Sequence, residues 1–309
     1  MTHEIQTTGG TLHVHTARYA VHELTGYIDW LYFFHAWGFP PKCGELDELH
    51  DCMGCRQAWV ASWPPRQQDK AREAIRLFED ARQMLRQLDA DGCGATARIV
   101  LSEATSEGDD IVLADGRRIP LLRQQQPTAE GYCYCLSDFV RPASHGIPDR
   151  IGIFVSSTDK TVEQRCSNDG YRHLLAQTLA DRLAEACIEK AHEQTRRQWW
   201  GYAPDECIPR RQLFAGQFQG IRPAVGYPSL PDQSLNFVLD GIVDFAQAGV
   251  TLTENGAMRP HASTSGLMIA HPQARHFSVG HIGEDQFADY ARRRGMEPGE
   301  LRRFFRNIR

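Results

Sequence analysis

Two segments of the chain have the apolar spacing of long amphipathic helices. In residues 67–90 the apolar positions recur every three or four residues, and a similar stripe runs through residues 169–200. The second segment is therefore expected to form the longest helix. Within it, Asp181 and Glu185 lie four residues apart and share one helix face. Like charges repel at this spacing, so the pair is either solvated surface charge or is balanced by a nearby cation or partner.

Short apolar runs predict strands between and after these helices. The runs 111–114 and 118–122 flank Asp115-Gly116, a strong hairpin signal, so we expect neighbouring strands to pair antiparallel. The remaining strand candidates are 97–101, 132–140, 150–156, 251–254, 265–270 and 276–281. The remaining helix candidates are 236–245, 285–294 and 298–305.

Two segments near the start of the chain have other patterns. Residues 1–20 are polar and rich in turn formers, and we expect residues 1–24 to be an extension with little core of its own. Residues 27–37 are densely aromatic, which indicates a buried anchor. Asp29 lies among these aromatics, where a carboxylate must have a partner. It is therefore either a helix N-cap or structural hydrogen-bond acceptor, or a contact for a ligand.

Residues 38–66 are rich in proline, and we expect an irregular insertion that contains a cysteine pair. Cys52 and Cys55 have the spacing of a metal-binding knuckle, in which two nearby thiolates face one ion. The sequence has no second C-x-x-C, so further ligands would have to come together through the fold. The candidates are His50, Cys93, Cys133 and Cys135. Free thiols, including Cys43, are the favoured interpretation, and no metal ligand is assigned.

Composition narrows the class of protein. The chain has 309 residues, 41% of them hydrophobic, which suffices for one large or two ordinary domains. Its formal net charge of -5 gives no electrostatic support for a nucleic-acid partner. No secretory signal is visible, and no apolar run approaches the roughly 18 residues that span a bilayer. The odd number of cysteines, nine, indicates free thiols in a reducing cytoplasm rather than a disulfide framework.

The stretch 222–228, Arg-Pro-Ala-Val-Gly-Tyr-Pro, concentrates binding chemistry in seven residues. Arg222 offers a planar fork of donors for a carboxylate, and Tyr227 offers an aromatic face with a polar tip. Gly226 permits either a positive φ or a close approach of the backbone to a bulky group. These features suit a small zwitterionic ligand that carries a carboxylate and a ring. The alternative is a rigid surface turn with Arg222 in a structural ion pair.

The signatures of the commonest enzyme classes are absent. The sequence contains no phosphate-binding G-x-x-x-x-G-K-[ST] loop and no G-x-G-x-x-G after a strand candidate. It also lacks H-E-x-x-H and the nucleophile elbow G-x-S-x-G. Triads assembled in space stay possible, because their members need not be adjacent in sequence.

Taken together, these stretches resemble the C-terminal activation domain of cobalamin-dependent methionine synthase, which binds S-adenosylmethionine. The resemblance is collinear over about residues 25–305. The matching stretches are 27–30, 122–125, 134–140, 180–186, 200–206, 220–228, 252–254, 257–258, 262–266, 271–272 and 285–296. The resemblance implies an α+β fold over residues 25–309, with 38–66 as an insertion. It implies a single C-shaped domain with a twisted, mainly antiparallel sheet flanked by helices.

The resemblance also implies roles for individual residues. Asp29 maps to the contact for the ligand's amino group, and Arg222 maps to the contact for its carboxylate. Glu185, on the long helix, maps to the neighbourhood of the methyl-transfer site, which Tyr227 shares. The physics agrees, because a sulfonium cation is favoured by nearby carboxylates and aromatic faces.

The remaining implied contacts lie in two segments. Ala224, Gly226 and Tyr227 map to the wall around the adenosyl and sulfonium groups. His276 and Phe277 map to the opposite wall, where the family usually carries two aromatic hydroxyls. Two further positions differ from the family, which usually has a glutamate at the position of Gly216 and a histidine at the position of Gln233.

The implied function is reductive reactivation of methionine synthase. In the resembled system, inactive cob(II)alamin receives one electron, usually from flavodoxin, and a methyl group from S-adenosylmethionine to give methylcobalamin. The Asp-x-His-x-x-Gly signature of a cobalamin-binding module is absent here, so we expect action in trans on a separate corrinoid protein. The alternatives are a non-catalytic module that binds S-adenosylmethionine or docks a corrinoid protein, and a metal- or cluster-containing activator.

Overall fold

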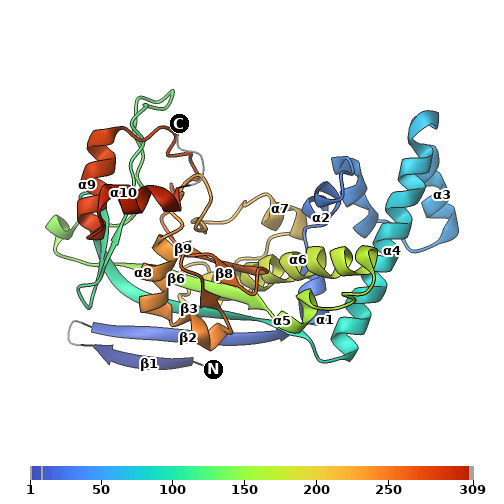
Figure 1. Ribbon diagram of the computed structural model, residues 1–309, viewed down its shortest axis with the longest axis horizontal. Helices are drawn as coiled ribbons and strands as arrows, with labels where there is room; N and C mark the ends of the chain where they lie inside the picture. Colours follow the sequence, from blue (N-terminus) through green and yellow to red (C-terminus); the bar gives the residue numbers. More distant parts are fainter. Residues whose placement is uncertain (1, 8–9, 306–309) are drawn as a thin grey trace.

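A curved antiparallel sheet forms the base of the molecule in the computed structural model, which describes residues 2–7 and 10–305 (Figure 1). The long central strand β3 pairs with β2 and then β4 along one edge, and with β6 along the other. β1 extends the sheet beyond β2, β5 beyond β4, and β9 beyond β6. The strands are β1 (Thr2–Thr7), β2 (Gly10–Ala20), β3 (Gly94–Glu107), β4 (Asp110–Leu113), β5 (Arg118–Pro120), β6 (Asp149–Thr158) and β9 (Ser263–Met268).

Helices cover the sheet and rise from both of its ends. They are α1 (Val21–Leu24), α2 (Trp30–Ala36), α3 (Met53–Ala61), α4 (Gln68–Ala90), α5 (Lys160–Glu163), α6 (Gly170–Gln194), α7 (Arg210–Phe214), α8 (Leu235–Val243), α9 (Glu284–Arg294) and α10 (Pro298–Leu301). A separate short ladder joins β7 (Thr251–Leu252) to β8 (Met258–Arg259). Within the described ranges, no helix combines the length and the apolar character needed to cross a membrane.

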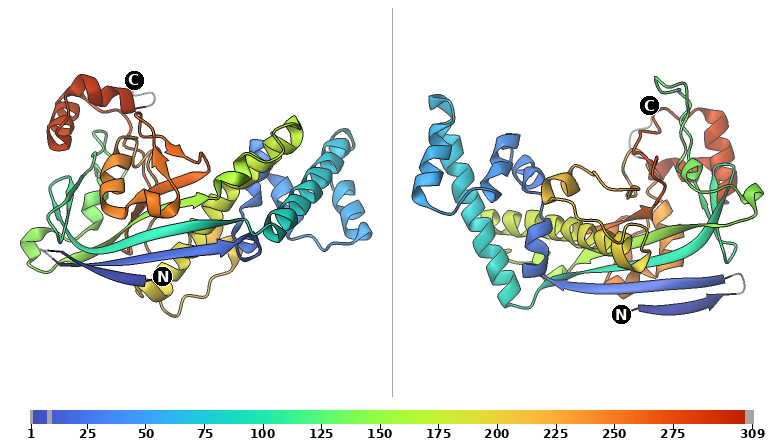
Figure 2. Two further views of the ribbon diagram at one scale, coloured as in Figure 1. Left: turned by 60° about the horizontal axis from the view of Figure 1, so that its bottom comes forward. Right: turned by 180° about the vertical axis from the view of Figure 1, so that it is seen from behind.

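The overall shape follows from where these helices stand. In Figure 1 the sheet and α6 form a floor, with α9 and α10 above one end and α2, α3 and α4 above the other. The view from behind in Figure 2 shows the same two raised ends. The prediction of a C-shaped α+β domain with a mainly antiparallel, helix-flanked sheet is confirmed.

Both faces of the sheet are buried, because neighbouring residues on β3 and β6 point into different apolar clusters. Ile99 and Phe154 belong to the first cluster, together with side chains of α2, α4 and α6. Val100 and Val155 belong to the second cluster, together with side chains of α8. The period of two along a strand sends adjacent side chains to opposite faces. A strand covered on both faces therefore reads as a continuous apolar run in the sequence.

The prediction that the first residues form an extension with little core of its own is wrong for β2. This strand pairs with β3 from His13 to Ala20, and Leu12 and Val14 are buried in the second cluster. Threonine and histidine side chains at the intervening positions weakened the apolar signal in the sequence. The segment 38–66 is also more regular than expected, since it contains α3.

Two strand candidates, 132–140 and 276–281, are wrong, because they form no ladder within residues 2–7 and 10–305. Their aromatic side chains anchor loops instead. The ring of Tyr134 lies 5.9 Å from the rings of both Phe139 and Phe277, measured between centroids. The other strand and helix candidates coincide with observed elements, with shifted boundaries.

A buried histidine lies on α6 near the middle of the molecule. His192 is fully buried, and its ring lies edge-on to Phe218 at a centroid distance of 5.1 Å. Burial lowers its pKa well below the usual value, and the charges of Arg196 and Arg222 lower it further. The imidazole is therefore neutral in the folded protein at pH 7.

This burial predicts a pH dependence of stability. Unfolded His192 binds a proton below about pH 6.5, whereas the folded form does not, so the stabilisation present above that pH is lost as the pH falls. The loss approaches about 1.4 kcal/mol per pH unit for one such group. Denaturant unfolding of His192→Leu between pH 7 and 5 should show a shallower decline than the parent. The exposed His35→Leu control should keep the parent slope, and an identical slope in both variants would contradict this assignment.

Candidate functional site

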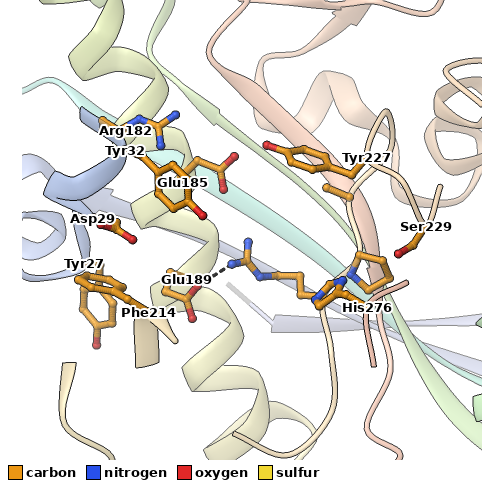
Figure 3. A pocket seen from close by; sticks show the side chains of 13 residues that line it. Tyr27, Asp29, Tyr32, Arg182, Glu185, Glu189, Phe214, Tyr227, Ser229 and His276 are labelled. Atoms are coloured by element: carbon orange, nitrogen blue, oxygen red, sulfur yellow. Dashed lines mark hydrogen bonds and ion pairs between the residues drawn. The ribbon is translucent and has the colours of Figure 1, made fainter. Parts of the chain in front are cut away.

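A cavity of about 400 Å³ lies between α2, α6 and the segment that follows α7. This volume is within the range of small-molecule sites, roughly 300–1,000 Å³. In Figure 3, Asp29, Glu185 and Glu189 lie on one side of it, and Tyr227 and His276 lie on the other. The full lining is Tyr27, Asp29, Tyr32, Arg182, Glu185, Glu189, Phe214, Arg222, Pro223, Ala224, Tyr227, Ser229 and His276.

One face of α6 supplies the charged wall. Arg182, Glu185 and Glu189 follow the three- and four-residue spacing that places side chains on one helix face. Asp181, the expected companion of Glu185, is not part of the lining. Its carboxylate lies 3.6 Å from the ring of His261, and burial raises its pKa.

The opposite wall is held in place by β9. The stretch 221–225 runs antiparallel along the second edge of this strand, with isolated bridges at Ile221 and Ala224. The carbonyl of Pro223 accepts a hydrogen bond from the backbone N–H of Leu267 at 3.0 Å. A Cβ added to Gly266 would lie only 2.1 Å from that carbonyl oxygen, so only glycine permits this approach. The pairing fixes the backbone on both sides of Arg222.

A turn after this stretch directs Tyr227 toward α6. Gly226 has a φ of +89°, and an added Cβ would meet no atom within 4 Å. A glycine is therefore needed at position 226 for the positive φ and not for a close approach of another group. Gly226 does not line the cavity. The hydroxyl of Tyr227 points toward Glu185 in Figure 3. The negative charge of Glu185 raises the pKa of this phenol, and burial raises it further.

Arg222 is both a lining residue and a member of an ion pair. Its Nη2 donates to Oε2 of Glu189 at 2.6 Å, and the two side chains are only 15% and 14% exposed. Within the part of the chain that the structure describes, Nε of Arg222 and Oε1 of Glu189 are buried without a hydrogen-bond partner. Unpaired buried polar atoms are costly, so this pair retains capacity for a further polar group.

Asp29 is both a helix N-cap and a residue of the cavity lining, the two alternatives that its sequence position left open. It is the N-cap of α2, where its Oδ1 accepts a hydrogen bond from the backbone N–H of Leu31 at 3.0 Å. It also lines the cavity, opposite Arg222 and its segment. Burial raises the pKa of its carboxyl group. A cationic group in the cavity would favour the ionised form.

His276 and Phe277, the two predicted contacts on one wall of the site, differ in position. His276 lines the cavity. Burial lowers its pKa and the positive charge of Arg222 lowers it further, so the ring is neutral at pH 7. Phe277 is outside the lining and packs against the second apolar cluster. Its carbonyl accepts a hydrogen bond from the hydroxyl of Ser229 at 2.6 Å. Gly216 and Gln233, the two other positions that differ from the resembled family, are also outside the lining.

The structure adds lining residues that the sequence did not single out. Glu189 and Arg182 could have been found, because they lie at helical spacing from Glu185. Phe214, at the end of α7, and Ser229, in the turn after Tyr227, carried no such signal, because only the fold brings them to the cavity.

The fold and the cavity define an α+β domain with a charged cavity of small-molecule size. Carboxylates of α6 and an arginine next to the sheet edge line this cavity. Residues 20–295 match the family described as vitamin B12 dependent methionine synthase, activation domain, and the chain belongs to this family. A crystal structure of the MetH reactivation domain bound to AdoHcy is similar, with 33% sequence identity and a TM-score of 0.81. The similarity covers 94% of this chain and 88% of that one. The resemblance inferred from the sequence is confirmed.

The burial of the Arg222–Glu189 pair predicts that loss of either charge lowers the free energy of unfolding. Glu189→Gln leaves a largely buried guanidinium without its counter-charge, and should lower the free energy of unfolding by about 1–3 kcal/mol. Glu284→Gln is the matched control, because Glu284 is 80% exposed and pairs with Arg302 at the surface. That control should change stability by less than about 0.5 kcal/mol. Equal losses in the two variants, measured by denaturant unfolding, would show that the buried pair has no special role.

Proposed function

We propose that the cavity binds S-adenosylmethionine and that the domain presents its methyl group for the reductive reactivation of cobalamin in methionine synthase. The membership of the family and the similarity to a reactivation domain bound to AdoHcy support this proposal. The observation that carries it is the placement of Asp29 and Arg222 in one cavity, where they can bind the amino and carboxylate ends of one zwitterion.

The charge of the cavity fits the proposed ligand. Three carboxylates and two guanidinium groups line it, and His276 is neutral, which leaves one net negative charge. S-adenosylmethionine carries an ammonium, a sulfonium and a carboxylate, hence one net positive charge. Opposite charges in a partly buried site attract more strongly than in water. The unpartnered Nε of Arg222 is a donor that a ligand carboxylate could satisfy.

Each residue then has a physical task. Asp29 accepts hydrogen bonds from the ammonium group, and Arg222, held by Glu189, donates to the carboxylate. Glu185 and the ring of Tyr227 stabilise the sulfonium charge by electrostatic and cation–π attraction. Ala224 and the turn at Gly226 shape the wall beside the adenosyl group. These contacts orient the ligand and exclude water, and orientation is the main contribution that such a domain makes.

When bound, S-adenosylmethionine supplies an electrophilic methyl group, and the reduced cobalt of cobalamin accepts it. No proton needs to move in this transfer, and the hydroxyl of Ser229 in the lining donates to the backbone carbonyl of Phe277 instead of to a base. We propose that the cobalamin is carried by a separate corrinoid-binding module of methionine synthase. One electron would come from flavodoxin or another one-electron donor, in the reducing cytoplasm.

The role of Arg222 can be tested directly. Arg222→Ala should weaken S-adenosylmethionine binding by about thirtyfold or more, since truncating one member of a buried charged pair costs about 2–5 kcal/mol. It should also abolish the formation of methylcobalamin on a cob(II)alamin-loaded corrinoid module. Arg222→Lys keeps the charge, and should fold well yet bind weakly, because a lysine lacks the planar fork. Binding is measured by calorimetry and methylation by visible absorption.

Arg72→Ala is the matched control, since Arg72 on α4 forms an exposed pair with Asp69 and is not a lining residue. It should bind and methylate like the parent. Full affinity and turnover in a folded Arg222→Ala protein would overturn the assignment.

The net charge of the cavity predicts a ligand preference. S-adenosylhomocysteine lacks the sulfonium charge, so it should bind about fivefold or more weakly than S-adenosylmethionine, a difference of about 1 kcal/mol. Glu185→Gln should reduce this preference, because it removes the carboxylate whose charge most raises the pKa of Tyr227. The preference should also shrink with rising salt. Equal affinities for the two ligands in the parent protein would contradict the proposed electrostatics.

A further inference from the structure

A second group of reactive side chains lies in the segment 38–66, outside the cavity. One ligand atom each of His50, Cys52 and Cys55 lies within 4.8 Å of the other two. The three residues span the turn before α3 and the first turn of that helix. In Figure 1, α3 stands at the end of the molecule opposite α9.

Backbone hydrogen bonds shape this turn. The N–H of Cys52 donates to the carbonyl of His50 at 2.8 Å, which folds the imidazole back toward the cysteines. The N–H of Cys55 donates to Sγ of Cys52, the N-cap residue of α3, at 3.3 Å. Backbone donors to sulfur favour the thiolate, the form that binds a metal. The C-x-x-C spacing thus becomes a three-donor group because the fold adds a histidine.

The other candidate ligands do not join this group. Cys43 is fully buried among apolar side chains, and burial raises its pKa to about 11. Cys93 and Cys135 are buried elsewhere, in the first and second apolar clusters. Among the described residues, His50, Cys52 and Cys55 form the one group of three or more such donors that converges.

The neighbouring charged residues hold the turn rather than compete for an ion. The carboxylate of Asp51 pairs with Arg56 at 2.5 Å and with Arg82 of α4 at 3.2 Å. Arg56 also pairs with Glu79 of α4. These contacts tie the turn to α4 and engage both oxygens of Asp51. The protein therefore offers three donors at this point, with the imidazole exposed and the thiols partly exposed.

We propose that His50, Cys52 and Cys55 bind one Zn²⁺ ion, with the fourth coordination position open to solvent. Thiolate and imidazole donors together suit Zn²⁺, with bonds of about 2.3 and 2.0 Å. A tetrahedral ion at these bond lengths needs donor atoms about 3.5–3.8 Å apart, so small side-chain rotations suffice. A disulfide between the cysteines would use two of the three donors and leave His50 without a function.

The ion would stabilise a segment that borders the proposed binding cavity. Lys42, Glu45 and Asp47, from the same segment, line an adjacent cavity of about 610 Å³ that also contacts Asp29. A metal that fixes the turn before α3 would restrain this wall. The site itself does not depend on the proposed function, because its evidence lies in the three donors alone.

Metal analysis tests the proposal without any assay of activity. Untagged protein purified under reducing conditions should contain one zinc per chain. Stripped protein should rebind Zn²⁺ in competition with a chromophoric chelator. Co²⁺ in its place should show the strong visible bands of a tetrahedral ion with thiolate ligands. Cys52→Ser, Cys55→Ser and His50→Ala should each weaken Zn²⁺ binding beyond the roughly 10–100-fold that loss of an outer-shell partner costs.

Cys207→Ser is the matched control, since Cys207 is exposed and lies outside the group, and it should bind zinc like the parent. Two results would overturn the proposal. One is a reduced parent protein that binds no zinc or binds it equally well in all variants. The other is a Cys52–Cys55 disulfide that persists in the reduced preparation and blocks metal binding.

Discussion

The ion pair between Arg222 and Glu189 joins the two walls of the cavity. Glu189 belongs to α6, which packs on the sheet, whereas Arg222 belongs to a stretch that pairs with the edge of β9. The pair is largely buried, so the removal of either charge would leave the other without compensation. The pair therefore adds a charged contact between the helix and the sheet edge to the packing of α6 on β6 and β9.

This contact also sets the electrostatics of the site. Glu189 neutralises part of the guanidinium charge, while Glu185 and Asp29 remain available to cationic groups. Burial raises the pKa of Asp29, and a cation bound at this end of the cavity would favour its ionised form, whereas the lowered pKa of His276 keeps a neutral ring at the other end. Such a distribution suits a ligand that has two cationic groups and one carboxylate. The same physics explains why a rigid scaffold, rather than a proton-transfer group, would be the main requirement for methyl transfer.

Much of the fold could be predicted because its long helices have an uninterrupted apolar period. The α4 and α6 helices were clear for this reason, and so was the hairpin at Asp115-Gly116. β2 escaped notice because threonine and histidine interrupt its apolar positions, although it pairs along β3. Aromatic loop anchors, such as Tyr134, were mistaken for strands since apolar side chains can pack without a backbone ladder. Local patterns report burial, and they do not report which backbone groups pair.

The site was predictable where its residues sit in dense local motifs, as Arg222 and Asp29 do. Phe214 was not, because only the fold brings it to the cavity. A crystal structure of the protein with S-adenosylmethionine would test the central claim most directly. The ligand carboxylate should lie within hydrogen-bond distance of Arg222, its ammonium group at Asp29, and its methyl group beside Tyr227. A ligand bound outside this cavity, or with its carboxylate away from Arg222, would contradict the account.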